Sequence, residues 1–250
     1  MPVFKDHFSN HAADYSRYRP GYPAELFAFL AEQAPDTQTA WDCGTGNGQA
    51  ALALAEHFTR VNASDASAEQ IAQAVPHPRI HYSVALAEHS GLPAAGISLI
   101  TVAQALHWFD LEAFYLEARR VLKPNGVLAA WTYGMNRVND GVDAVTRHLY
   151  AGITAPCWPP ERRHIDAMYT QLPFPWPRLP TPAFTMTAEW TLDEYCGYLH
   201  TWSGVRRYQQ TQGENPLRLI ETELAAAWGD PHARHTVTWP LAVLLGRKEA

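Results

Sequence analysis

The stretch that decides the fold is Trp41-Asp42-Cys43-Gly44-Thr45-Gly46-Asn47-Gly48, which reads WDCGTGNG over residues 41–48. It ends an apolar run over 39–43 and opens a segment with apolar residues at helical spacing over 48–57. Glycines in a strand-to-helix turn let the backbone turn tightly and approach a ligand closely. Dinucleotide and phosphate sites also use such turns, so the turn alone does not identify the ligand.

Two residues of this turn separate the possible ligands. The dinucleotide pattern G-x-G-x-x-G requires glycine at position 49, where this chain has Gln49. Asp42 lies at the mouth of the turn, where a carboxylate would repel a pyrophosphate and attract a cation. S-adenosylmethionine has no phosphate and carries an ammonium and a sulfonium. The turn therefore favours S-adenosylmethionine, with Asp42, Gly44 and Gly46 as candidate binding residues.

Working outward, short apolar runs alternate with segments of helical spacing as far as residue 134. This alternation predicts βαβ units and a parallel sheet, so the fold class is α/β. A helix over 23–34 begins the series, with Pro23 at its first position. A turn is expected at 123–126, where the sequence is Lys-Pro-Asn-Gly. The predicted strands are 39–43, 61–64, 80–85, 97–103 and 126–133, and the predicted helices between them are 48–57, 68–74 and 111–122.

After residue 134 the chain changes character. Eight prolines lie between Pro156 and Pro182, a density that excludes a long regular element. A capping box, Thr191-x-x-Glu194, predicts one helix that continues to about residue 208, and a further helix is predicted over 217–228. Alternating or continuous apolar residues predict strands at 184–190 and 236–245, both added antiparallel to the parallel set.

Composition narrows the class of protein. The 250 residues are 47% hydrophobic and 18% charged, which excludes an intrinsically disordered chain. With 19 basic and 25 acidic residues the net charge is −6, which argues against a nucleic-acid partner. No apolar run reaches the roughly 18–20 residues of a membrane span, and the first 20 residues lack the apolar core of a secretory signal. Three widely spaced cysteines fit a reducing cytoplasm, so we expect a cytoplasmic protein without a membrane partner.

Further acids follow the second and third predicted strands. Asp65 ends the second strand, 23 positions after Asp42, and is placed to accept hydrogen bonds from both ribose hydroxyls of a nucleoside. Its alternative role is to cap the helix that follows. Ala66, beside it, and the pair Ala87-Glu88, after the third strand, are expected near the nucleoside and its adenine. Glu88 is equally compatible with a solvated surface position.

These motifs together resemble those of class I S-adenosylmethionine-dependent methyltransferases. The matching stretches are WDCGTGNGQA, SDASAEQI, ALAEHSGLP, ITVAQALHWFD and EARRVLKPNGVLAAW, in the family's order over roughly residues 40–133. HAADYSRYRPGYP near the start and HWFD at 107–110 are similar to the small-molecule branch that includes trans-aconitate methyltransferase. One departure is Ser98, where the family usually has a structural aspartate.

The resemblance implies a Rossmann-like sheet of seven mostly parallel strands in the order 3-2-1-4-5-7-6, with strand 7 antiparallel and helices on both faces. It also implies one methyltransferase domain over residues 1–250. Within it we expect a cofactor flap and first helix at 1–38, the S-adenosylmethionine-binding core at 39–134, a helical and proline-rich substrate-side insert with an edge strand at 135–235, and the final strand at 236–247.

In the family, the segment after strand four passes beside the transferred methyl group. Gln104 is therefore a candidate for the cofactor site, and His107 and Trp108 are candidates for catalysis. The indole N–H of Trp108 would hold a substrate carboxylate, which needs no base. A hydroxyl acceptor would need one, and His107 is the nearest histidine. A core role for Trp108 and a backbone-satisfied His107 are the structural alternatives.

Other site residues follow from the resemblance or from spacing. Tyr15 and Arg19 belong to a segment that folds over the cofactor in related enzymes. The remaining substrate candidates are expected to line the acceptor pocket, although the aromatic members also suit plain packing, and the arginine suits a solvated position. Cys196-x-x-x-His200 lacks a recognised zinc spacing, so no metal is expected. These substrate candidates are Trp108, Tyr133, Tyr198, Trp202 and Arg206.

The sequence thus predicts an S-adenosylmethionine-dependent enzyme that methylates a small molecule, on a carboxylate or hydroxyl oxygen, with the carboxylate favoured. Proximity and alignment would supply most of the catalysis. Methylation of nitrogen or carbon is the alternative chemistry, and a non-catalytic cofactor-binding domain is the alternative class. A nicotinamide dehydrogenase is disfavoured by Asp42 and Gln49. The oligomeric state is left open.

Overall fold

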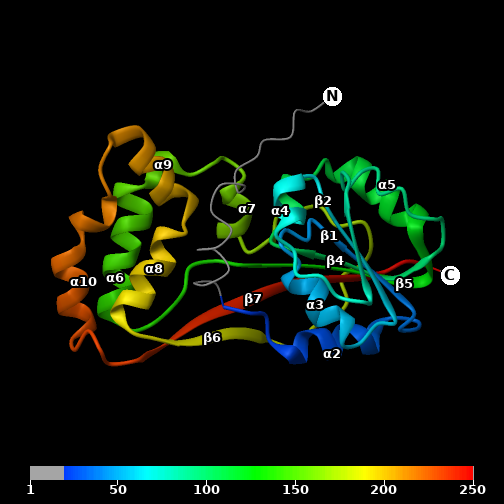
Figure 1. The fold of residues 1–250 in the computed structure, drawn as a ribbon, viewed down its shortest axis with the longest axis horizontal. Helices are drawn as coiled ribbons and strands as arrows, with labels where there is room; N and C mark the ends of the chain where they lie inside the picture. The colour runs from blue at the N-terminus through cyan, green and yellow to red at the C-terminus, as the bar shows by residue number, and fades with distance from the viewer. Residues whose placement is uncertain (1–19, 250) are drawn as a thin grey trace.

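The computed structural model describes residues 20–249 of the chain. Its centre is a seven-stranded sheet in the order β3-β2-β1-β4-β5-β7-β6 (Figure 1), which confirms the predicted α/β fold and strand order. Strand β7 is antiparallel to both of its neighbours, so β6 runs in the same direction as β5. The prediction that β6 and β7 both join antiparallel to the main set is therefore wrong for β6. The strands are β1 (Thr39–Cys43), β2 (Arg60–Asp65), β3 (Ile80–Val84), β4 (Ile97–Ala103), β5 (Leu122–Tyr133), β6 (Phe184–Trp190) and β7 (His235–Arg247).

Helices cover both faces of this sheet. Helix α2 (Ala24–Gln33) and α3 (Gln49–Ala55) bury apolar residues such as Leu30 and Leu54 with one face of the central strands. Helix α5 (Leu111–Val121) packs Phe114 and other apolar residues on the opposite face. The short α4 (Ala68–Ala72) follows β2. A strand with helices on both sides must be apolar on both faces, which accounts for the almost uniformly apolar sequence of β4.

The Lys-Pro-Asn-Gly segment at 123–126 does not interrupt β5 as a separate turn. The strand begins at Leu122, which pairs with Ile97, and the pairing resumes with Val127 opposite Leu99. The residues between are accommodated as an irregularity in the strand, where Asn125 has a left-handed φ of 61°. The predicted turn at 123–126 is therefore wrong, because the sheet continues through these residues and β5 begins at Leu122, before the predicted start at 126.

Ser98, at the edge of this irregularity, takes part in a charged cluster. Its hydroxyl donates to Asp36 Oδ1 at 2.5 Å, and Lys123 Nζ lies 2.8 Å from Asp36 Oδ2 and 2.9 Å from Ser98 Oγ. Asp36 precedes β1 in the chain, so the cluster joins the starts of three neighbouring strands. It supplies a carboxylate beside Ser98, where the family usually has aspartate.

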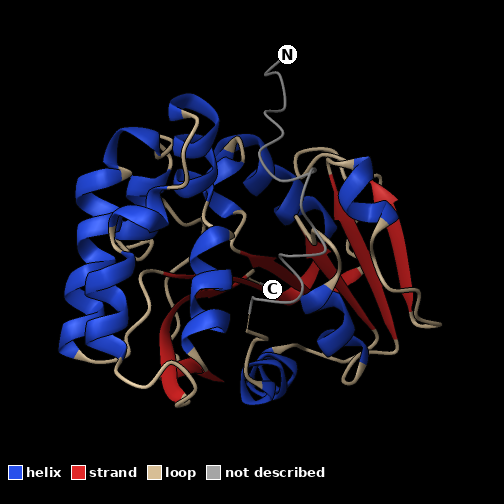
Figure 2. Cartoon of the chain, turned by 60° about the vertical axis from the view of Figure 1, so that its left-hand side comes forward, coloured by secondary structure: helices blue, strands red, loops and turns tan. Residues whose placement is uncertain are grey.

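A helical insert stands at the end of the sheet where β7 and the edge strand β6 lie (Figures 1 and 2). Its apolar centre includes Tyr195, Tyr198 and Trp239. The prediction of one continuous helix at 191–208 is wrong, because the structure has two helices there. The first ends at His200, and Trp202 precedes the second. The predicted capping box of Thr191 and Glu194 is present. The insert's helices are α6 (Asp140–His148), α7 (Arg162–Asp166), α8 (Leu192–His200), α9 (Ser203–Gln212) and α10 (Glu221–Trp228).

Shorter helical turns complete the chain between these elements. They are Leu106–Trp108, Leu149–Ile153, Ala155–Cys157 and Pro216–Leu219. None of the helices within residues 20–249 has the length and apolar character needed to cross a membrane.

Candidate functional site

The glycine turn after β1 has the backbone that its sequence predicts. Gly44, Gly46 and Gly48 all have left-handed φ angles, of 70°, 56° and 90°. A Cβ at Gly44 would lie 2.7 Å from the Cβ of Ala105, and one at Gly48 would lie 2.5 Å from the hydroxyl of Tyr82. The first and third glycines are thus favoured both by conformation and by close packing, against Ala105 after β4 and Tyr82 on β3.

Asp42 is fully buried under this turn. Its carboxylate accepts hydrogen bonds from Thr45 Oγ1 at 2.5 Å and from Thr101 Oγ1 at 2.8 Å. Burial raises the pKa of Asp42 to about 6 even though the threonine hydroxyls act in the opposite direction, and the negative charge of Asp65 adds to the rise. At neutral pH the side chain is therefore an anion held in a dry place, which suits attraction of a nearby cation.

Asp65 ties the end of β2 to the same turn. Its Oδ2 accepts the backbone N–H of Gly46 at 2.8 Å, and its Oδ1 accepts the backbone N–H of Ser67 at 2.9 Å. Ser67, and not Asp65, caps α4, because its hydroxyl accepts the N–H of Gln70. Each carboxylate oxygen can accept more than one hydrogen bond, so this arrangement is compatible with the predicted ribose contacts.

Glu88 and Ala87 lie in the loop after β3. Ala87 is buried, and Glu88 Oε1 accepts the backbone N–H of Asp110 at 2.9 Å. Asp110 in turn caps the start of α5 by accepting the N–H of Ala113. Glu88 thus connects the predicted adenine side of the site to the segment that carries His107, rather than projecting only into solvent. Ala66 follows Asp65 and is half-buried.

The residues at these strand ends fit S-adenosylmethionine by their chemistry. Asp42, Asp65 and Glu88 offer carboxylate oxygens, which suit ribose hydroxyls, an amino group and a sulfonium, and which would repel a pyrophosphate. They stand at the carboxyl ends of strands, where open α/β sheets bind ligands. The predicted flap residues Tyr15 and Arg19 lie outside the described residues.

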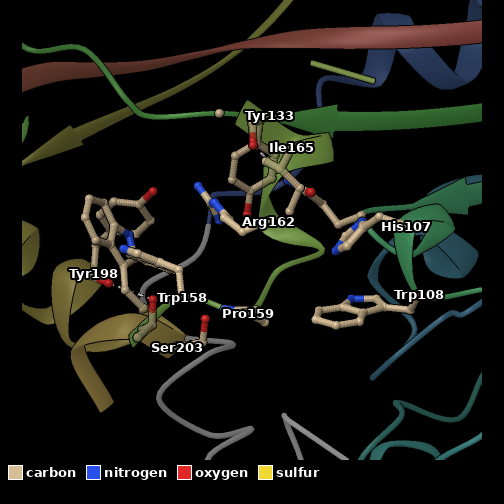
Figure 3. Close-up of a pocket in the computed structure, with 13 residues that line it drawn as sticks. His107, Trp108, Tyr133, Trp158, Pro159, Arg162, Ile165, Tyr198 and Ser203 are labelled. Atoms are coloured by element: carbon tan, nitrogen blue, oxygen red, sulfur yellow. Dashed lines mark hydrogen bonds between the residues drawn. The ribbon is translucent and has the colours of Figure 1, made fainter. Parts of the chain in front are cut away.

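A pocket lies between the segment after β4 and the helical insert (Figure 3). Its cavity volume is about 80 Å³. His107 and Trp108 form one side and Trp158 and Tyr198 the other, with Arg162 between them. The lining residues are Gln104, His107, Trp108, Tyr133, Gly134, Trp158, Pro159, Arg162, Ile165, Tyr198, Thr201, Trp202 and Ser203.

The structure brings most of the predicted substrate residues together in this pocket. Tyr133, Tyr198 and Trp202 are buried members of its wall, and Gln104, His107 and Trp108 are also on it. Arg206 is not among the lining residues, and its Nε donates to the backbone carbonyl of His200 at 3.3 Å. The cation on the wall is Arg162, which the sequence did not single out.

Arg162 is held by neighbouring aromatic and acidic side chains. Its Nε donates to the hydroxyl of Tyr150 at 2.9 Å and lies 3.4 Å from Asp166 Oδ1. Its guanidinium carbon is 4.9 Å from the centre of a Trp158 ring and 5.2 Å from that of Tyr150, both cation–π distances. The sequence signal for Arg162 is weak, because Pro159 and Pro160 indicate only a break before a short helix.

His107 is buried, and its Nδ1 lies 2.8 Å from the hydroxyl oxygen of Tyr169. Burial lowers the pKa of His107 to about 3, and the positive charges of Arg162 and His164 lower it further. The imidazole is therefore neutral throughout the physiological pH range. Tyr169 comes from the proline-rich stretch and is also a residue that sequence reasoning missed.

Gln104 lies on the pocket wall and is tied to β5. Its φ of 56° is left-handed, its backbone N–H donates to Trp131, and its side-chain oxygen accepts the Thr132 hydroxyl at 2.7 Å. A non-glycine residue in this conformation is sustained by the structure around it and is typical of functional sites.

Within residues 20–249, no group of three His, Cys, Asp or Glu side chains is placed to bind a metal ion.

Comparison with known proteins agrees with this geometry. The family described as "Methyltransferase domain" matches residues 41–130. A protein of Dictyostelium discoideum named as a methyltransferase is 31% identical over 254 residues, which cover 98% of this chain and 96% of that relative. Methyltransferase cfoB of Aspergillus candidus is 28% identical over 201 residues, which cover 68% of this chain and 63% of the relative.

A solved structure extends the similarity through the insert. It is from Anaeromyxobacter dehalogenans, is described as a type II methyltransferase, and matches with a TM-score of 0.87 at 49% sequence identity. The match covers 92% of this chain and 98% of that one. Fold, glycine turn and relatives therefore agree, and the chain belongs to the class I S-adenosylmethionine-dependent methyltransferases.

Proposed function

We propose that this enzyme methylates a carboxylate oxygen of a small, flat organic acid and releases a methyl ester. The observation that carries the proposal is the composition of the pocket wall. Of the lining residues, which all lie in the described part of the chain, Arg162 is the only one with a full charge. Aromatic rings of Trp108, Tyr133 and Trp202 supply flat apolar surface around it.

The guanidinium of Arg162 supports the choice of an anion. Only its Nε is engaged, with Tyr150 and Asp166, and within residues 20–249 no hydrogen bond to its two terminal nitrogens is found. Arginine binds carboxylates through two parallel N–H groups, and the cation–π contacts with Trp158 and Tyr150 hold the guanidinium in place. A carboxylate that enters the pocket thus meets a positioned partner.

Methyl transfer to a carboxylate requires few further groups from the protein. S-adenosylmethionine, when bound, supplies the methyl group on an electrophilic sulfonium. A carboxylate is already ionised at pH 7 and needs no base, so the chain's residues have to bind the acid, orient one oxygen and exclude water. Arg162 would bind the acid, and the aromatic wall would exclude water. Trp108 remains a candidate for holding the carboxylate oxygens.

A hydroxyl acceptor is the second candidate, because His107 lies on the same wall. Its pKa of about 3 makes the ring a weak base, which is poorly matched to removing a proton from a phenol or an alcohol at pH 7. This disfavours the hydroxyl relative to the carboxylate.

The cellular setting is also proposed. Cys43, Cys157 and Cys196 are free thiols, which fits the reducing conditions of the cytoplasm. The net charge of −6 fits a small-molecule substrate better than nucleic acid.

The direct test is a screen with S-adenosylmethionine labelled in its methyl group. Matched acceptors would be presented side by side: an aromatic acid, its amide, and the corresponding phenol. We expect label in a base-labile methyl ester of the acid. Label in a stable ether, in nitrogen or in carbon would contradict the carboxylate, and binding of S-adenosylhomocysteine without any transfer would indicate a non-catalytic domain.

A further inference from the structure

We infer that Tyr169 is a positioning residue that holds His107 with its proton on Nε2, so that the ring donates an N–H to the acceptor carboxylate. The inference rests on the proposed function for the identity of the acceptor. It concerns two buried residues from distant parts of the chain, joined by the 2.8 Å contact between Tyr169 Oη and His107 Nδ1. The question is which of the two atoms donates.

The surroundings of the Tyr169 oxygen answer it. Within residues 20–249, His107 Nδ1 is the only hydrogen-bond partner of this fully buried hydroxyl. If Nδ1 carried the proton and donated it, the hydroxyl proton would be buried without an acceptor, which is costly.

The hydroxyl oxygen of Thr132 also neighbours Tyr169, but in the described part of the chain only His107 Nδ1 is placed for a hydrogen bond with the Tyr169 hydroxyl. The proton of Thr132 goes to Gln104 Oε1 at 2.7 Å, so Thr132 has only a lone pair to offer. A neutral imidazole nitrogen is a much stronger base than an alcohol oxygen, and its 2.8 Å distance is that of a good hydrogen bond. Tyr169 therefore donates to Nδ1.

The consequence appears at the other edge of the ring. A neutral imidazole carries one proton, and if Nδ1 accepts, the proton is on Nε2. Tyr169 is not on the pocket wall, whereas His107 is, so the edge away from Tyr169 faces the pocket (Figure 3). Burial and the positive charges of Arg162 and His164 keep the pKa of His107 low, so the ring stays a neutral donor.

His107 and Arg162 then act on the same type of ligand. Both present N–H groups to the pocket, and a carboxylate can accept from both, whereas the O–H of a neutral alcohol would find no acceptor at Nε2. The proline-rich stretch supplies Arg162 directly and controls His107 through Tyr169. Tyr169 has a left-handed φ of 57°, and its backbone N–H donates to His164 at 2.8 Å, so its position is fixed by the turn after α7.

The decisive experiment is nitrogen NMR of the full-length protein with ¹⁵N-labelled imidazoles. The His107 signals are assigned by their loss in His107→Gln. We expect a protonated Nε2 and an unprotonated, hydrogen-bonded Nδ1 in the wild type. In Tyr169→Phe the preference should be lost and Nδ1–H should become populated. A protonated Nδ1 in the wild type, or an unchanged tautomer in Tyr169→Phe, would overturn the inference.

Kinetics with the acid supply a second readout. Tyr169→Phe should raise KM for the acid about tenfold, since one charge-assisted hydrogen bond is misdirected, with a smaller change in kcat. The matched control is Tyr195→Phe, which removes a buried hydroxyl bonded to Asn136 and Thr146 and not to the pocket. An equal rise of KM in the control would reduce Tyr169 to a structural role. If no acid is methylated while Nε2 still carries the proton, the proposed function fails and the tautomer assignment stands.

Discussion

The carboxylate of Asp42 on β1 accepts a 2.8 Å hydrogen bond from the hydroxyl of Thr101 on the adjacent strand β4. The two residues are also paired in the register of the parallel strands. This contact holds a buried acid at the point where the chain turns away from the sheet. The negative charge under the glycine turn is thus fixed in place, and its titration should be visible in cofactor binding.

We predict that affinity for S-adenosylhomocysteine falls as the pH drops from 7 to 5. The pKa of Asp42 is about 6, so acidification protonates the carboxylate and removes its attraction for the ligand's ammonium group. Binding that favours the ionised form weakens by up to about tenfold per pH unit below that pKa. Calorimetry at several pH values measures it. The isosteric Asp42→Asn variant should bind weakly with little pH dependence, and an unchanged pH slope in that variant would show that another group titrates.

Asp65→Ala should weaken binding of S-adenosylhomocysteine by more than tenfold. The reason is loss of the carboxylate that holds the N–H of Gly46 and is placed for the ribose hydroxyls, at about 1.5–3 kcal/mol per charged hydrogen bond. Ser67→Ala is the matched control, because it removes the cap of α4 and keeps the carboxylate. That control should cost about 1 kcal/mol of stability with little change in affinity. Equal losses of affinity in both variants would mean that Asp65 acts only by ordering the turn.

Arg162→Gln should raise KM for the acid acceptor by about 10- to 100-fold, because a charged partner of the carboxylate is lost. Arg206→Gln serves as the control, since Arg206 lies outside the pocket wall. Steady-state kinetics with saturating S-adenosylmethionine separates the two arginines. A large effect of Arg206→Gln and a small effect of Arg162→Gln would restore the role that the sequence alone suggested for Arg206.

At saturating cofactor and acid, kcat should be constant between about pH 5.5 and 8. The acid is ionised over this range, and His107 stays neutral because its pKa of about 3 lies well below it. A hydroxyl acceptor predicts a different profile, with a rate that rises with pH as the hydroxyl is deprotonated. A stopped assay with product extraction at each pH distinguishes the two, and a rising profile would argue against the carboxylate.

The places of the cofactor-site candidates in the fold could be predicted from the sequence because their signals are local. The glycines of the turn, Asp42 and Asp65 each lie next to a strand end, and the order of parallel strands places strand ends along one edge. His107 and Trp108 follow β4 directly, so their position at the pocket also follows from the chain path. Local sequence was sufficient wherever the sheet itself positions the residue.

The structure of the insert was harder to predict because tertiary packing determines where its helices begin and end. The predicted helix at 191–208 breaks where Trp202 packs on Trp158 and Tyr198, an aromatic cluster that no local pattern indicates. Arg162 and Tyr169 lie in a stretch whose prolines predict only irregular backbone. Their roles depend on contacts with Tyr150 and His107 that are distant in sequence, so no spacing rule could have found them.

The cluster of Asp36, Ser98 and Lys123 has a consequence for how the chain tolerates substitution. Lys123 has its carboxylate partner on Asp36, from the segment before β1, whereas Ser98 contributes only a hydroxyl. Asp36→Asn would therefore leave the lysine without its acid where three strands begin. An acid placed at position 98 in that variant would offer Lys123 a carboxylate again, so the two positions are interdependent.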